Sequence, residues 1–188
     1  FDVNEYLYSL AVEMSLGHWD NHANNKNNFY LYQSPVDGLM HYITYDLDNT
    51  LGVDWINQDW AAKNIHAWGD ANNYYPLYHR IKSVPEYQLR LQIFLAEINA
   101  HLTSTAFINR SLGYRDQTTG YIGSDPSYPL DYGYDSTTHY NAWHSASGGH
   151  VKKGIQPFIA QRVSQTQNQF ISGNADPVLW RPRLLGAS

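Results

Sequence analysis

Residues 17–52 read GHWDNHANNKNNFYLYQSPVDGLMHYITYDLDNTLG, and this stretch decides how the 188-residue chain is organised. It opens on a polar loop that carries Asp20 and, five residues later, Asn25. Two β-rich runs follow, Phe29–Gln33 and Leu39–Tyr45, and the Pro and Asp-Gly between them are turn formers. The stretch therefore predicts a short β-hairpin behind a polar loop.

An Asp-x-Asp pair, Asp46 and Asp48, closes the hairpin. Residues two apart in a strand face the same side, so a strand that continues this far would aim both carboxylates at one cation. Asn25 would add an amide oxygen, and an all-oxygen ligand set suits Mg²⁺, Mn²⁺ or Ca²⁺ rather than zinc. Protein kinases place an acid, an amide, a hairpin and metal-binding acids in this order. The alternative is that the pair caps a turn and that residues 21–28 form solvated Asx-turns.

Composition limits the classes of function. The net charge is −5, with 12 Lys and Arg and no basic stripe, so no nucleic-acid partner is predicted. No apolar run approaches the roughly 18 residues of a membrane span. Cysteine is absent, which excludes disulfides and thiolate metal sites. Sixteen Tyr and six Trp favour an extracellular or surface protein.

Helical spacing predicts three helices around the central stretch. The first spans residues 1–16, with Asp2 as its N-cap and its end near Gly17. The second opens on a capping box at 83–86 and runs to about Leu102. The third begins near residue 155 and ends before Gly173, and its inward side chains are predicted to be Ile155, Phe158, Ile159, Val163 and Phe170. The buried face of the second helix is predicted to include Leu89, Ile93, Phe94, Ala96 and Ile98.

The remaining segments lack periodicity. Residues 49–75 are irregular and aromatic, with Trp55, Trp60 and Trp68 as core or interface residues. Residues 111–150 are predicted as an irregular insertion. The fold class is α+β, mainly α, in one domain over residues 1–188.

Two further groups of residues raise alternative predictions of metal or sugar binding. His18 and His22 flank Asp20 and raise the alternative of a zinc site, but polar-loop histidines are the favoured interpretation. The insertion could form a Ca²⁺-binding or sugar-binding surface from Asp125, Asp131 and Asp135 among its tyrosines. A metal-dependent phosphate-ester hydrolase is a weaker possibility that only the Asp-x-Asp pair supports.

Several motifs of the chain resemble the CotH (spore coat protein H) kinase family. These are Trp19-Asp-Asn21, Lys26-Asn-Asn-Phe-Tyr-Leu-Tyr32 and Tyr45-Asp-Leu-Asp-Asn-Thr-Leu-Gly52. Two later segments, Arg80–Tyr87 and His150–Phe158, follow in the order the family shows. The resemblance covers nearly the whole chain.

This resemblance implies an atypical, secreted or surface-associated protein kinase of the cell or spore surface. Asp20 then matches the acid that orients and deprotonates a Ser or Thr hydroxyl of a protein substrate. Asp46, Asp48 and Asn25 match the ligands of Mg²⁺ or Mn²⁺, with Ca²⁺ as an alternative. Asn25, Lys26 and Asp46 would contact the ATP; Asn24 and Asn28 compete with Asn25 for the amide role.

The chain departs from a complete kinase at one point. No Gly-rich cover and no strand Lys precede Asp20, so the resemblance implies a kinase-like C-terminal lobe without its N-terminal lobe. We expect that lobe elsewhere or on a second chain, and little activity from these residues alone. The alternative function is a non-catalytic surface or adhesion module that keeps a structural metal and binds glycan or protein through residues 111–150.

Overall fold

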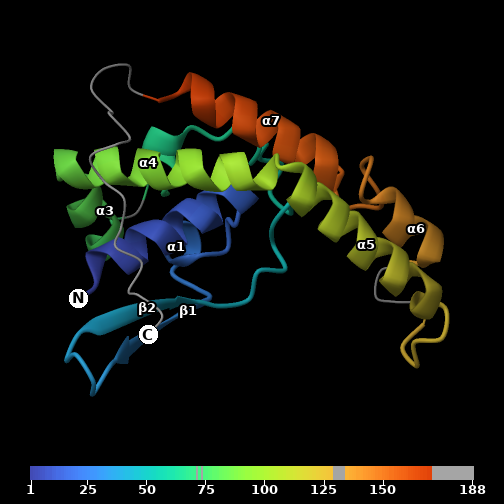
Figure 1. Cartoon of the computed structure of the whole chain (residues 1–188), viewed down its shortest axis with the longest axis horizontal. Helices are drawn as coiled ribbons and strands as arrows, with labels where there is room; N and C mark the ends of the chain where they lie inside the picture. The colour runs from blue at the N-terminus through green and yellow to red at the C-terminus, as the bar shows by residue number, and fades with distance from the viewer. Residues whose placement is uncertain (71, 73, 129–133, 171–188) are drawn as a thin grey trace.

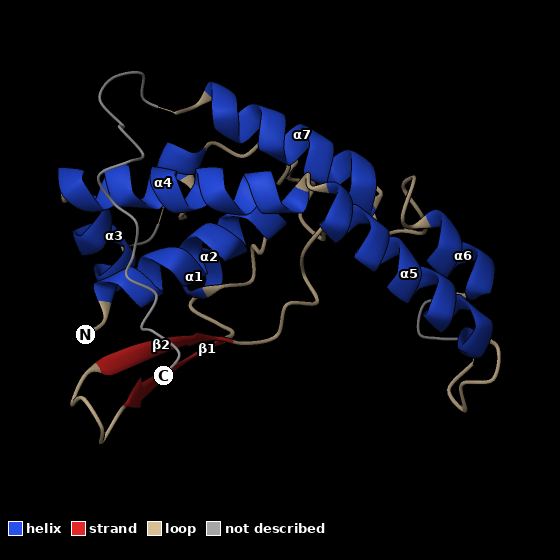
Figure 2. Ribbon diagram, in the orientation of Figure 1, coloured by secondary structure: helices blue, strands red, loops and turns tan. Residues whose placement is uncertain are grey.

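The computed structural model describes residues 1–70, 72, 74–128 and 134–170. Over these ranges the chain is mainly helical and contains one two-stranded antiparallel sheet, which confirms the predicted α+β class (Figures 1 and 2). In the part of the chain that is described, no helix combines the length and the apolar character needed to cross a bilayer.

Helix α1, Val3–Leu16, lies at the centre of the fold. The Asp2 side chain caps it by accepting from the Glu5 N–H at 2.9 Å, as predicted. Gly17 ends it in the left-handed region at φ 71°. A Cβ at Gly17 would lie 2.4 Å from Phe158 Cζ, so the helix end is also tightly packed. The buried face of α1 comprises Tyr6, Leu7, Leu10, Ala11, Glu13, Met14 and Ser15.

The hairpin packs on α1 opposite α4 (Figure 1). Strands β1 (Phe29–Gln33) and β2 (Met40–Thr44) pair in a register that sets Phe29 opposite Thr44. Of the β2 side chains, Tyr42 is buried against the core. Because β2 ends at Thr44, the strand does not continue to Asp46 and Asp48, so the condition under which strand pleating would align their carboxylates is not met.

Helix α4, Pro85–Leu102, runs along α1 and α7. The predicted capping box does not form: Val84 is the N-cap, and the Ser83 hydroxyl donates to the Arg80 carbonyl at 2.7 Å. Phe94 and Ile98 are buried as predicted, whereas Leu89 is 39% exposed and Ala96 is also exposed. The buried face is rotated from the predicted one, because it also includes Leu91, Leu95 and Leu102, of which Leu95 is completely buried.

Three short helices were not predicted. Helix α2 (His22–Asn25) lies in the polar loop, and η1 (Ile65–Ala67) and α3 (Pro76–Lys82) follow the hairpin. Their lengths are below the window in which helical periodicity is visible. Trp60 and Trp68 are buried in the connecting segment, while Trp55 is 46% exposed and stacks on His150.

The predicted irregular insertion at 111–150 is wrong in part. Helix α5 spans Thr105–Ile122 and α6 spans Ser136–Asn141, and together they extend from the end of α4 (Figure 1). Arg115 is the buried side chain of α5, so this helix has no apolar stripe from which to predict it. Arg115 lies over the ring of Tyr140 in α6, and its Nη1 lies 2.9 Å from Nε2 of His144, which follows α6.

The last helix, α7 (Ile155–Asn168), packs on α1 and α4. Phe158 and Val163 are buried as predicted, and Ile155, Ile159 and Phe170 are half-buried. Gly173, predicted to lie beyond its end, is outside the described residues.

Candidate functional site

Asp20 lies in the turn between α1 and α2, where two amides hold its carboxylate. Asn25 Nδ2 donates to Oδ1 of Asp20, and Asn28 Nδ2 donates to Oδ2 at 3.0 Å. The short helix α2 accounts for the first contact, because one turn of helix brings Asn25 back toward Asp20. The sequence spacing of acid and amide therefore corresponds to a direct contact.

The Asn-rich loop and the end of the hairpin meet at Asn28. Its backbone is left-handed, at φ 54°, and its carbonyl accepts the Tyr45 N–H at 3.0 Å. Asp46 is the next residue, so this bond places the Asp-x-Asp segment beside the Asp20 loop.

Asp46 adopts a strained backbone conformation. Its φ is 50°, in the left-handed region that non-glycine residues seldom adopt and that recurs at functional sites. Asp46 and Asp48 are both exposed. Beyond Asp46 the chain turns: the Thr50 hydroxyl donates to the Leu47 carbonyl at 2.8 Å, and Asn49 donates to Asp48 at 2.9 Å. Asp48 thus lies in a turn, as the alternative interpretation holds.

A buried histidine lies beneath these carboxylates. Burial lowers the pKa of His18, while the Asn49 backbone and then the charges of Asp20, Asp48 and Asp46 raise it. Its side chain is fully buried, and neither ring nitrogen makes a well-aligned hydrogen bond to a described residue. The loop acid and both acids of the Asp-x-Asp pair thus act on the pKa of the same buried imidazole.

The donor set suits a hard cation. Asp46, Asp48 and Asn25 offer only oxygen ligands, and Mg²⁺ typically needs one or two carboxylates together with substrate phosphates. The carboxylates of Asp20, Asp46 and Asp48 do not converge as a group within 4.8 Å. Among the described residues, the set of ligand-type side chains that does meet this distance is Asp2 and Glu5, at the start of α1, with His41 of β2.

The other polar residues of the loop point elsewhere. The ammonium of Lys26 lies 4.8 Å from the centre of the Tyr75 ring, so contact with a nucleotide would require it to leave that ring. The Asn24 side chain lies 3.2 Å from Asn21 Oδ1, and Asn21 is the N-cap of α2. Of the two competitors for the amide role, Asn28 is thus the one that contacts Asp20.

His22 is a core residue, and the polar-loop interpretation of both histidines is wrong. Its side chain is 7% exposed and packs edge-on against Tyr6, Phe29 and Tyr42. Burial, and then the charge of His79, lowers the pKa of His22 to about 4. Together with His18 it supplies neutral, buried imidazoles.

Sequence reasoning missed Glu13, a buried acid behind the site. It is 1% exposed and accepts hydrogen bonds from Asn21, Tyr42 and Thr44. Burial raises the pKa of Glu13 to about 7, against the lowering effect of these three bonds. The sequence contains a sign of this residue: position 13 falls on the apolar face that Tyr6 and Leu10 define, where an acidic side chain is unexpected.

Asp125 and Asp135, two of the three acids predicted to form a Ca²⁺-binding or sugar-binding surface, lie within the described residues. Asp135 caps α6 by accepting from the Thr138 N–H at 2.7 Å, and Asp125 accepts from the Ser127 N–H at 2.8 Å. Asp131 lies outside the described residues. The two described acids therefore accept from nearby backbone N–H groups, Asp135 as a helix cap and Asp125 in a turn.

Comparison with known proteins identifies one family. A family model described as CotH kinase protein matches residues 1–164 of the chain. The match spans both halves of the site. No curated protein and no solved structure shows significant similarity to the chain.

Proposed function

The chain belongs to the CotH kinase family, and from this premise we propose that it carries the acceptor-orienting and metal-binding half of an atypical protein kinase with a kinase-like C-terminal lobe. The reaction is transfer of the ATP γ-phosphoryl group to a protein Ser or Thr hydroxyl, outside the cytosol at a cell or spore surface. The support is the family match together with the hydrogen bond from the Tyr45 N–H to the Asn28 carbonyl, which places the segment that carries Asp46 beside the loop whose Asn25 and Asn28 hold Asp20.

Asp20 has the surroundings of an acceptor-orienting acid. Both of its oxygens accept from amides, so its carboxylate is fixed in orientation while the residue stays partly accessible. The acceptor oxygen forms a bond to the γ-phosphorus, the bond from that phosphorus to the oxygen bridging to ADP breaks, and Asp20 takes the hydroxyl proton. Fixing the carboxylate in advance lowers the cost of ordering it in the transition state.

Asp46, Asp48 and Asn25 would hold the metal. A bound Mg²⁺ or Mn²⁺ supplies positive charge that offsets the charge developing on the phosphoryl oxygens. The left-handed backbone at Asp46 favours this residue as the one that is held for a function. Lys26 and the N-terminal half of a nucleotide clamp, on another lobe or a second chain, would complete the ATP contacts.

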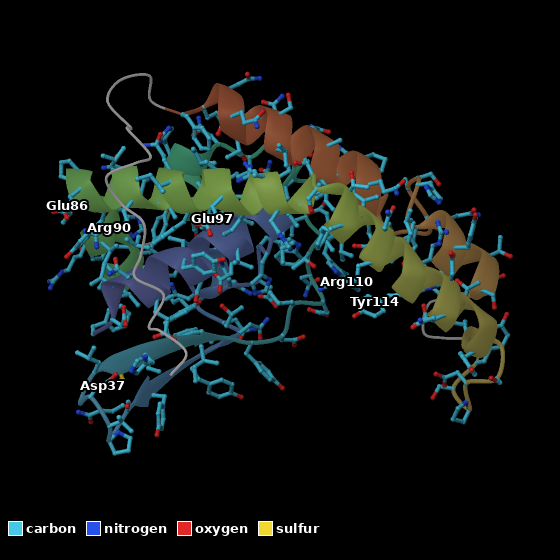
Figure 3. The ribbon with its side chains drawn as sticks, viewed as in Figure 1. Asp37, Glu86, Arg90, Glu97, Arg110 and Tyr114 are labelled. Atoms are coloured by element: carbon cyan, nitrogen blue, oxygen red, sulfur yellow. The ribbon has the colours of Figure 1, made fainter. Side chains whose placement is uncertain are left out.

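Calorimetry tests the proposal directly. We expect Mn²⁺-ATP to bind the chain and the double variant Asp46→Asn/Asp48→Asn to lose that binding. A matched control, Glu97→Gln/Asp116→Asn, also removes two negative charges, from exposed positions on α4 and α5 (Glu97 is labelled in Figure 3). Equal binding by the two double variants would refute the metal assignment. In a form of the protein that phosphorylates, Asp20→Ala should abolish transfer and spare Mn²⁺-ATP binding.

A second candidate function rests on exposed tyrosines of α5, of α6 and of the segment between these helices. Tyr114, Tyr121, Tyr128 and Tyr140 are 59%, 76%, 40% and 44% exposed, and Figure 3 labels Tyr114 on α5. Exposed aromatic rings favour stacking on a glycan or a protein, so a surface-binding module is the alternative. Replacing Tyr114 and Tyr121 by Ser should then abolish attachment to intact cells or spores and leave Mn²⁺-ATP titrations unchanged. Unaltered attachment would remove this candidate.

A further inference from the structure

Glu13 connects the two segments that carry the proposed catalytic and metal-binding acids. We infer that Glu13 is a positioning residue that sets the separation between Asp20 and Asp46 by holding Asn21 and Thr44 on one buried carboxylate. The inference rests on the proposed function, because it concerns the same site.

The geometry of the carboxylate is fully specified. Asn21 Nδ2 donates to Glu13 Oε2 at 2.7 Å, and Thr44 Oγ1 donates to Oε1 at 2.8 Å. The Tyr42 hydroxyl also donates to Oε1, at 3.0 Å. These bonds join α1 to the Asp20 loop and to the last strand residues before the Asp-x-Asp pair.

Asn21 is fixed at both ends of its amide. Its Oδ1 accepts from the Ala23 and Asn24 N–H groups at 3.1 and 3.2 Å and so caps α2. Its Nδ2 is thereby directed at Glu13 and cannot exchange places with the oxygen without losing the cap. Because Asp20 is the preceding residue, the Glu13–Asn21 bond fixes the start of the loop that holds it.

Thr44 transmits the same constraint to the hairpin. It is the last residue of β2 and pairs with Phe29. The next residue, Tyr45, donates to the Asn28 carbonyl, and Asp46 follows with its left-handed backbone. The Thr44 hydroxyl therefore holds the strand end at the point where the chain turns into Asp46.

A carboxylate is suited to this junction by its donor–acceptor chemistry. All three partners present donors here, and a carboxyl group offers acceptor lone pairs at both of its oxygens. Burying it carries a desolvation cost, which is why its pKa is raised. A packing role alone would be served by Leu or Met without that cost.

Polarity reversal separates positioning from packing. In Glu13→Gln, the amide oxygen can still accept from Tyr42 and Thr44. The amide NH₂ group then faces Asn21 Nδ2, which is also a donor, so the bond to Asn21 is lost. Glu13→Gln/Asn21→Asp restores the link with donor and acceptor exchanged, and Asp caps a helix as well as Asn. Glu97→Gln, on the exposed face of α4, is the matched control (Figure 3).

The experiment is calorimetric titration of the full chain with Mn²⁺-ATP, with thermal unfolding recorded for each variant. We expect Glu13→Gln to bind about tenfold more weakly, the loss typical of one hydrogen bond to a charged group, and the double variant to recover. Glu97→Gln should bind as the wild type does. If Glu13→Gln does not fold, Thr44→Val carries the test, since it removes one donor at a strand position that suits a β-branched residue.

Wild-type affinity in Glu13→Gln, or no recovery in the double variant, would overturn the inference. Hydrogen–deuterium exchange of the ligand-free chain separates this result from failure of the proposed function. If the wild type does not bind Mn²⁺-ATP, the proposal that these residues bind the metal–nucleotide without another lobe fails, and exchange at residues 20–25 and 45–48 then decides the role of Glu13. Faster exchange in both segments of Glu13→Gln, reversed in the double variant, supports positioning; unchanged exchange overturns it.

Discussion

The amide of Asn28 donates to Oδ2 of Asp20 at 3.0 Å, so the residue that precedes β1 holds the acid that follows α1. Asn25 holds the other oxygen of the same carboxylate. The two asparagines are thus equivalent as partners of Asp20, and their roles differ only if one of them also binds metal.

Replacing each asparagine separately distinguishes these roles. We expect Asn25→Ala to weaken Mn²⁺-ATP binding about tenfold, because it would remove a metal ligand. Asn28→Gly should leave the affinity within about twofold, since glycine accepts the backbone φ of 54° without strain. Titration calorimetry measures both. The reverse pattern would assign the metal-binding amide to Asn28.

Asp46 should show a conflict between stability and binding. Asp46→Gly relieves a left-handed backbone that costs on the order of 1 kcal/mol in a non-glycine residue, so urea unfolding should give a more stable protein. The same variant should lose Mn²⁺-ATP binding. Asp48→Gly is the control, since Asp48 is absent from the residues with positive φ. A less stable Asp46→Gly variant would show that the conformation is not strained.

Glu13 should make stability depend on pH. Its pKa is raised from 4.5 to about 7 on folding, so its stabilising effect is fully present below pH 4.5 and is lost as the pH rises to 7. One such group changes the free energy of unfolding by about 1.4 kcal/mol per pH unit inside this window. Urea unfolding from pH 4 to 8 should show wild type losing stability relative to Glu13→Gln.

The other titrating groups near Glu13 do not obscure this comparison. Tyr6 and Tyr42 face it and stay neutral, because burial and then the charge of Glu13 raise the pKa of each. The pKa of His22 is lowered to about 4, so its titration makes the free energy of unfolding rise with pH, opposite to the effect of Glu13. This contribution is the same in the wild type and in Glu13→Gln and cancels in their difference. A difference curve that is flat between pH 4.5 and 7 would contradict the buried-acid assignment.

Two glycines should respond to alanine in opposite directions. Gly17→Ala combines a φ of 71° with a Cβ 2.4 Å from Phe158, so we expect it to destabilise the fold by roughly 2–3 kcal/mol. Gly113 lies in the interior of α5 with nothing within 4 Å of a Cβ, and Gly113→Ala should stabilise by roughly 0.5–1 kcal/mol. Urea unfolding at one pH measures both. Equal effects would contradict the packing at the end of α1.

Local rules predicted the elements whose signals are contained in a few residues. The Asp2 cap, the Gly17 end of α1 and the strand Phe29–Gln33 were all predicted, because caps, turns and alternation act over one or two turns of chain. Helix α5 was missed because a helix with one buried side chain has no apolar period to detect. Ser83 followed the capping pattern, but α3 ends at Lys82 and the Ser83 hydroxyl donates to the carbonyl of Arg80 in α3 instead.

The sequence by itself determined the donors of the candidate site and their order: Asp20, Asn25, then Asp46 and Asp48. Only the tertiary structure decided how they meet. The strand that would have aligned Asp46 with Asp48 ends at Thr44, and a left-handed residue and a turn replace it. The buried carboxylate of Glu13 joins the two halves across more than twenty residues of chain. Burial of that charge depends on residues far apart in sequence, so no local pattern can encode it.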